Sequence, residues 1–300
     1  MPPSTHASVV YAEQLSRLGY CYPLWDPEPT QFGEVLLGDV GHIFEGQFFR
    51  IFNATRGTDD RVNERGVQDG YIPLHFDQSD VHRHENYIPG PLYSTNVRRT
   101  DTGGPGETVG KEFTDACRFR CDNSQGAVLL LKESATYEEL SIPRRIAYYT
   151  KRNIKNWLAF ARDSLQLDLA LENIISVYGC VKTADWALAA FFDGSGSAEL
   201  TFRGFGAPAA AAFSVGDTCF STSPAYNCGP LYATDDNATR RVQVNPVIDD
   251  LPDSSSTGEI NRKQCIFLRY ITLRRHGLFL RHIVADGSSL TGHQDDDYPA

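Results

Sequence analysis

Apolar residues follow a helical period in two segments of the chain. Residues 7–18 place Tyr11, Leu15 and Leu18 three or four positions apart, which is the spacing of one helix face. Residues 143–165 carry a longer apolar stripe, made of Ile146, Tyr149, Ile154, Trp157, Phe160, Ala161 and Leu165. The two patterns predict two amphipathic helices.

Capping signals set the expected ends of these helices. Gly19 follows the first apolar face and predicts that the first helix stops there. Ser141 is the predicted N-cap of the second helix. Pro143 falls in the first turn, where a missing N–H leaves no hydrogen bond unmade.

Most other apolar segments are short and rich in β-branched and aromatic residues, which favours strands. The expected strands are 34–40, 48–52, two within 117–131, 174–192, 198–205, 263–273 and 277–284. Gly194-Ser195-Gly196-Ser197 predicts a turn that makes 174–205 one long hairpin. Because strands and helices do not alternate regularly, we predict an α+β fold. We expect a twisted, mostly antiparallel sheet with a long amphipathic helix and long β-hairpins.

Polar segments set the expected domain organisation. Residues 1–285 are predicted to form a single α+β domain, with flexible loops at about 100–110 and 235–261. The tail 286–300 contains an acidic run and is predicted to be disordered. A chain of 300 residues is long enough to bury one large core.

The overall composition excludes several classes of protein. The chain has 28 Lys and Arg against 38 Asp and Glu, a formal net charge of −10, which argues against general binding of nucleic acids. No apolar run approaches the roughly 18–20 residues of a transmembrane helix. The N-terminus lacks the layout of a secretory signal, so we expect a cytoplasmic protein with seven reduced, mostly buried cysteines.

The charge distribution changes this picture, because two stretches contain no acidic residue. Residues 143–156 have a charge of +5 and residues 262–282 a charge of +6. A basic amphipathic helix can lie on an anionic membrane, or it can cover its own sheet and leave a solvated cationic face. The candidate lipid-binding residues are Arg144, Arg145, Lys151, Arg152, Lys155, Arg269, Arg274 and Arg275.

A second candidate site groups residue types that bind metals, namely His75, Asp80, His82 and His84. On a strand, His82 and His84 would point to the same face and could share a metal with a carboxylate. The same pattern is common on solvated loops. The sequence shows no nucleophile motif and no phosphate-binding loop, so we expect no catalytic residues and no cofactor.

Several segments resemble an uncharacterised protein family of mushroom-forming fungi. The first segments are Gly19-Tyr20-Cys21-Tyr22-Pro23-Leu24-Trp25, Gly38-Asp39-Val40-Gly41 and Phe48-Phe49-Arg50-Ile51-Phe52-Asn53. Further segments are Tyr178-Gly179-Cys180-Val181-Lys182-Thr183 with Trp186, the stretch 112–131 and Gln264-Cys265-Ile266-Phe267-Leu268-Arg269. Together they cover most of the chain, and the family supplies no catalytic residues.

The order of segments also resembles the pore-forming N-terminal domain of gasdermins. A Pro- and aromatic-containing approach precedes Gly38-Asp39-Val40, a helix leads into a long extended stretch, and a basic strand region follows. This resemblance implies that the hairpin 174–205 inserts into a membrane and that the basic helix contacts lipid.

These observations lead to one main expectation and two alternatives. We expect a non-enzymatic cytoplasmic protein that joins anionic membranes on activation and forms gasdermin-like pores in cell death or defence. Its expected partners are anionic lipid and further copies of itself, and no nucleic acid. The alternatives are a metal-dependent enzyme using His75, His82 and His84, and a binding module for an acidic partner.

Overall fold

The computed structural model describes residues 3–100, 117–192, 197–205, 208–216, 223–230, 262–276 and 279–285. For residues 3–5, 275–276 and 279–285 it describes the backbone alone. The predicted loops at 100–110 and 235–261 and the predicted tail 286–300 therefore lie, except for Thr100, outside the described residues.

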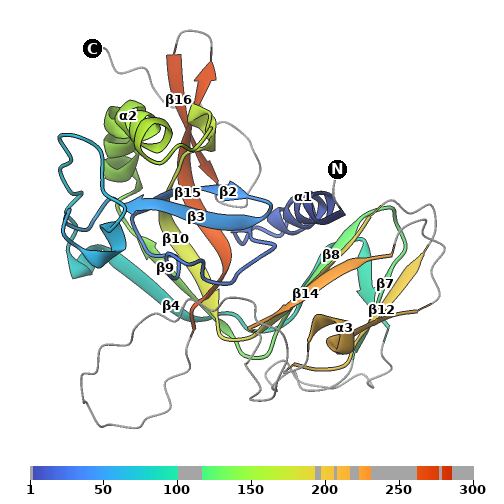
Figure 1. Cartoon of the computed structure of the whole chain (residues 1–300). Coiled ribbons are helices and arrows are strands. Elements are labelled where there is room, and N and C mark those ends of the chain that lie inside the picture. The colour runs from blue at the N-terminus through green and yellow to red at the C-terminus, as the bar shows by residue number, and fades with distance from the viewer. Residues whose placement is uncertain are drawn as a thin grey trace, which may run out of the picture.

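The larger part of the molecule is built on a strongly twisted antiparallel sheet, here called the main sheet (Figure 1). Its central path runs β1-β15-β10-β2-β3, while β16 pairs with β15, and β9 links β10 to β4. The strands are β1 (Tyr22–Pro23), β2 (Asp39–Phe44), β3 (Gln47–Asn53), β4 (Val81–Ile88), β9 (Ala135–Leu140), β10 (Ile175–Thr183), β15 (Gln264–His276) and β16 (Phe279–Ala285). The predicted α+β class with antiparallel strands is confirmed.

Helix α2 (Pro143–Ala159) covers one face of the main sheet and continues into a π-helical turn, Phe160–Ser164. The predicted helix over 143–165 is confirmed, but its predicted cap is wrong. The N-cap is Ile142, whose side chain makes no capping bond. Ser141 instead donates its backbone N–H to the carbonyl of Asp80, 2.7 Å away, because the chain enters the helix directly from β9.

The smaller part is a β-sandwich of two four-stranded antiparallel sheets, ordered β14-β11-β8-β5 and β13-β12-β7-β6. Phe119, Leu130, Phe191 and Leu200 fill the core between them. The strands are β5 (Leu92–Tyr93), β6 (Val97–Arg99), β7 (Cys117–Cys121), β8 (Gly126–Leu131), β11 (Trp186–Phe191), β12 (Ala198–Phe202), β13 (Phe213–Val215) and β14 (Ala225–Gly229). The short helix α3 (Ala209–Ala212) packs beside β13 and β14.

The predicted long hairpin over 174–205 does not form. Strand β10 ends in the main sheet at Thr183, β11 lies in one sheet of the sandwich and β12 lies in the other. Strand β11 is buried on both faces, since Leu188 packs toward the main sheet and Phe191 toward the sandwich core. Its partners are β8 and β14, which are strands far away in sequence.

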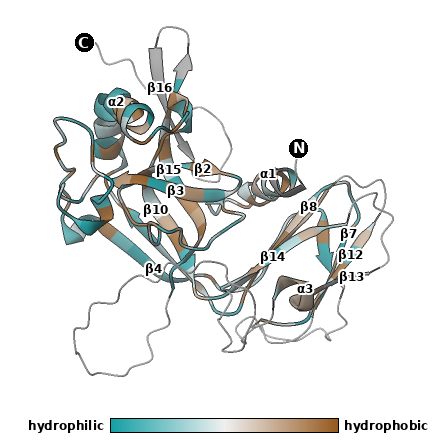
Figure 2. Cartoon of the chain, in the orientation of Figure 1, coloured by the Kyte–Doolittle hydropathy of each residue, from teal (hydrophilic) through white to brown (hydrophobic). Residues whose placement is uncertain are grey.

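Helix α1 (Pro3–Ser16) lies between the main sheet and the sandwich (Figure 1). Its buried residues Tyr11 and Leu15 share one apolar cluster with Trp186 of β11 and Phe267 of β15. The predicted first helix is confirmed. The cluster therefore packs the main sheet, α1 and the sandwich against one another. Figure 2 shows the hydrophobic residues along the inner strands and hydrophilic residues along the outer surface of α2.

Three 3-10 turns complete the described structure: Arg61–Asn63, Gln78–Asp80 and Leu171–Asn173. The first two belong to the segment between β3 and β4, which passes beside α2. In the part of the chain that the structure describes, no helix is both long and apolar enough to cross a membrane.

Candidate anion-binding surface on helix α2

The outward face of α2 carries a continuous row of cationic side chains with one aromatic residue among them. We call this set the α2 stripe: Arg144, Tyr148, Lys151, Arg152 and Lys155. The members lie three or four residues apart from one another or side by side, so they share one helix face. All five are exposed, and α2 contains no acidic residue.

The opposite face of α2 holds the helix on the main sheet. Ile146, Ile154 and Trp157 are buried there. Trp157 packs edge-on against Phe52, with ring centroids 5.7 Å apart, and shares a cluster with Leu273 of β15. Because this face is occupied by the protein core, the exposed cations are fixed on the outside.

The cations of the α2 stripe have no acidic partner in the described part of the chain. No carboxylate there lies within 4.0 Å of Arg144, Lys151, Arg152 or Lys155, although ion pairs occur elsewhere. Arg145, at the flank, is different. Its guanidinium is 3.1 Å from the Asp80 carboxylate and donates to the carbonyl of His75 over 2.7 Å. Arg145 therefore fastens the neighbouring loop, and the four unpaired cations remain available to a partner.

The loop fastened by Arg145 runs along the flank of α2. The Tyr149 hydroxyl donates to the carbonyl of Ile72, 2.7 Å away, and the buried Leu74 packs in one cluster with Ile146. The side chain of Ile72 is nevertheless 68% exposed. Ile72 is thus an exposed apolar residue whose backbone is hydrogen-bonded to α2.

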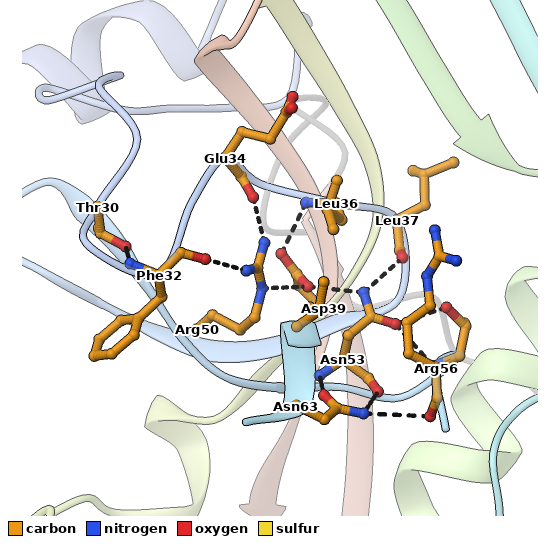
Figure 3. A network of polar contacts seen from close by, with 12 residues as sticks. Thr30, Phe32, Glu34, Leu36, Leu37, Asp39, Arg50, Asn53, Arg56 and Asn63 are labelled. Carbon is orange, nitrogen blue, oxygen red and sulfur yellow. Dashed lines mark hydrogen bonds and ion pairs between the residues drawn. The ribbon is translucent and has the colours of Figure 1, made fainter. Parts of the chain in front are cut away.

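A buried polar network fixes the start of this loop on the hairpin of β2 and β3 (Figure 3). Asp39 is fully buried, and its carboxylate accepts hydrogen bonds from Arg50 Nε at 2.7 Å and Asn53 Nδ2 at 2.8 Å. It also accepts a bond from the backbone N–H of Leu36 at 2.8 Å. Burial raises the pKa of the Asp39 carboxyl, and these three donors offset that rise only in part.

Arg50 uses its remaining donors to hold the approach to β2. Its two terminal nitrogens donate to the backbone carbonyls of Phe32 and Glu34. An arginine in the middle of the apolar strand β3 is therefore satisfied by one carboxylate and two carbonyls. Removing either charge would leave the other buried and unpaired.

Two glycines let the backbone approach closely around this network. Gly38 has φ +83°, and a Cβ there would lie 2.4 Å from the side chain of Thr55. At Gly41 a Cβ would lie 2.2 Å from the carbonyl oxygen of Phe49. Both positions exclude larger residues, which gives the segment Gly38-Asp39-Val40-Gly41 a structural explanation.

The network continues from β3 into the loop that reaches α2. Asn63 accepts from the backbone N–H of Asn53 at 2.6 Å and donates to the carbonyls of Arg56 and Gly57. The Tyr71 hydroxyl donates toward the carbonyls of Asn53 and Arg56, at 2.9 and 2.7 Å. The residue before Ile72 is therefore anchored to the interior of the protein.

The second basic stretch reaches α2 only in part. Strand β15 packs under α2 through Ile271 and Leu273. Arg269 is half-buried and lies 2.7 Å from the Glu139 carboxylate, so it is engaged in an ion pair. Arg274 is exposed, and the side chain of Arg275 lies outside the described residues. Of the predicted cations, Arg144, Lys151, Arg152 and Lys155 come together on one face.

The residues of the alternative metal site are not brought together. Asp80 pairs with Arg145, and the His75 carbonyl accepts from the same guanidinium. His82 and His84 are exposed on β4, opposite Glu139 and Tyr137. Within the described ranges no three His, Cys, Asp or Glu side chains are placed to hold a metal ion.

The described cysteines are buried thiols that form no disulfide with one another. Burial raises the pKa of the Cys180 thiol to about 12, so it is not a thiolate at neutral pH. The pKa of Cys265, on the neighbouring strand β15, is raised for the same reason. These thiols behave as small apolar side chains.

Sequence reasoning missed the Asp39 network and the role of Ile72. Arg50 within the apolar run Phe48-Phe49-Arg50-Ile51-Phe52 was a usable signal, because a charged residue on a buried strand needs a partner. The exposure of Ile72 depends on which elements flank its loop, and no local pattern reveals it.

Comparison with protein-family models, curated proteins and solved structures gives no match to this chain.

Proposed function

We propose that this chain is a non-enzymatic protein that binds anionic membranes through the α2 stripe. The observation that carries the proposal is the row of four exposed cations on one helix face, without an acidic partner among the described residues. Unpaired cations on a fixed helix face attract phosphate and carboxylate groups of lipid headgroups.

The strength of this attraction is modest. Each basic residue near an anionic membrane contributes about 1 kcal/mol. Four residues therefore contribute roughly 4 kcal/mol, which corresponds to about a thousandfold preference for the surface. Such binding is reversible and sensitive to salt.

The proposed activity on the membrane is pore formation in cell death or defence, with several copies assembling in the cytoplasmic leaflet. It is supported by the resemblance in layout to the gasdermin pore-forming domain. Insertion of the predicted hairpin 174–205 is not part of the proposal, because β11 and β12 belong to different sheets.

Liposome binding and leakage test the proposal. We expect the protein to sediment with phosphatidylcholine vesicles that contain phosphatidylserine, and to release a trapped dye from them. It should do neither with phosphatidylcholine alone. Lys151→Ala with Lys155→Ala should weaken binding about thirtyfold, since two contributions of about 1 kcal/mol are lost.

The matched control is Arg98→Ala with Lys132→Ala, which removes the same charge from the sandwich, where both residues face acidic partners. This control should bind as the unchanged protein does. An equal loss of vesicle affinity in both double variants would refute a role for the α2 stripe. Binding without dye release would refute pore formation and leave membrane binding in place. Equal affinity for vesicles and for a soluble polyanion such as heparin would favour a module for acidic partners.

A further inference from the structure

The two most exposed large hydrophobic side chains among the described residues both lie at α2. Tyr148 is 70% exposed and Ile72 is 68% exposed. Tyr148 belongs to the α2 stripe, four residues after Arg144 and three before Lys151. Ile72 lies at the flank, because its carbonyl accepts the hydroxyl of Tyr149, the residue next to Tyr148.

The exposure of Ile72 is built into the fold and does not come from a loose loop. On one side, the Tyr71 hydroxyl donates toward the carbonyls of Asn53, at the end of β3, and Arg56. On the other side, Leu74 is buried under α2 and the His75 carbonyl is held by Arg145. The protein therefore fixes the backbone on both sides and still presents an isoleucine to solvent.

Exposed apolar residues among fixed cations match the chemistry of a lipid bilayer. Tyrosine prefers the boundary between headgroups and acyl chains, where its ring is in an apolar phase and its hydroxyl is hydrated. Isoleucine gains nothing from a soluble polyanion, but it gains free energy when it leaves water for the acyl region. A combination of cations and apolar side chains is typical of helices that lie in the membrane interface.

We propose that Tyr148 and Ile72 insert into the interfacial layer of an anionic bilayer, while Arg144, Lys151, Arg152 and Lys155 contact lipid headgroups. This inference rests on the proposed function and adds to it the two apolar side chains that enter the bilayer. A symmetric contact between two copies through this surface is disfavoured, since two α2 stripes would face each other with charges of the same sign.

The affinities for vesicles and for heparin, measured separately, test the inference. The variant Tyr148→Ser with Ile72→Ser should lose roughly tenfold or more in affinity for vesicles containing phosphatidylserine. Its affinity for heparin should stay within about twofold, because the cations are unchanged. The matched control, Tyr93→Ser with Val9→Ser, replaces exposed residues of the same kinds away from α2 and should bind vesicles as the unchanged protein does.

A spectroscopic variant measures insertion directly. In Tyr148→Trp the new indole should be quenched by lipids brominated near the headgroup when vesicles are added, and its emission should shift to shorter wavelength. Thermal unfolding monitored by circular dichroism checks that each variant is folded. The three tryptophans of the chain are buried, so the unchanged protein supplies the background.

The outcomes separate this inference from the proposed function. If Lys151→Ala with Lys155→Ala weakens vesicle binding but the Tyr148 and Ile72 variant does not, insertion is wrong and the membrane function stands. If the unchanged protein binds heparin but no vesicles, both are wrong. The Tyr148→Trp variant gives a further test. If it binds vesicles but brominated lipid does not quench the fluorescence of the new indole, insertion is wrong.

Discussion

The α2 stripe and the β-sandwich differ in how their exposed charged residues are paired. On the sandwich, Arg120 reaches both Asp122 and Glu199, and Arg98 also meets Asp122. On α2, four cations lack any such partner in the described part of the chain. Ion pairs on a surface add little stability, so the difference concerns recognition. The side of the molecule with unpaired charge is where a partner is expected.

The interiors of the two parts also differ. The sandwich core is apolar, with Phe119, Phe191 and Leu200 between its sheets. The main sheet buries Asp39, Arg50 and Asn53 in addition to its apolar clusters. This network stabilises one arrangement of the loop beside α2, so it connects the interior of the protein to the proposed binding surface.

The largest expected effect is a loss of stability on breaking a buried ion pair, compared with breaking an exposed one. Arg50→Ala should lower the free energy of unfolding by roughly 3–5 kcal/mol, since it leaves the Asp39 carboxylate buried and unpaired. Arg98→Ala removes an exposed partner of Asp122 and should cost at most about 1 kcal/mol. Urea unfolding measures both values. Similar losses in the two variants would contradict the structural role given to the Asp39 network.

The smallest expected effect concerns the thiols of both parts. Because burial raises the pKa of Cys180 to about 12, its thiolate is scarce at pH 8. Burial also raises the pKa of Cys121 in the sandwich. Replacing either cysteine by alanine should leave the number of thiols that react quickly with Ellman's reagent at pH 8 unchanged. The loss of a fast-reacting thiol in one variant would show that its part of the molecule opens.

The sequence predicted both helices and the antiparallel α+β class, because these depend on local periodicity and on the absence of strand–helix alternation. The strands with which β11 and β12 each pair could not be predicted. Apolar residues on both faces of β11 show that it is buried, but they do not show which strands pair with it. The partners, β8 and β14, are set by tertiary packing.

In the candidate site, too, some features follow from local sequence and others only from tertiary packing. The cationic face of α2 followed from residues three and four positions apart, which is local information. The pairing of Arg269 with Glu139 required β9 and β15 to lie on the two sides of β10. Arg145 met Asp80 only because the loop before β4 runs beside α2. Charge counts along a sequence therefore overestimate the free cations of a fold.

The salt dependence of vesicle binding tests the central claim most directly. Partition onto vesicles containing phosphatidylserine should be measured between about 0.05 and 0.5 M NaCl. The two proteins to compare are the unchanged chain and a variant with Arg144, Lys151, Arg152 and Lys155 all replaced by Gln. The account predicts steep salt dependence for the unchanged protein and a much flatter, weaker curve for the variant. Two curves of equal slope would contradict it.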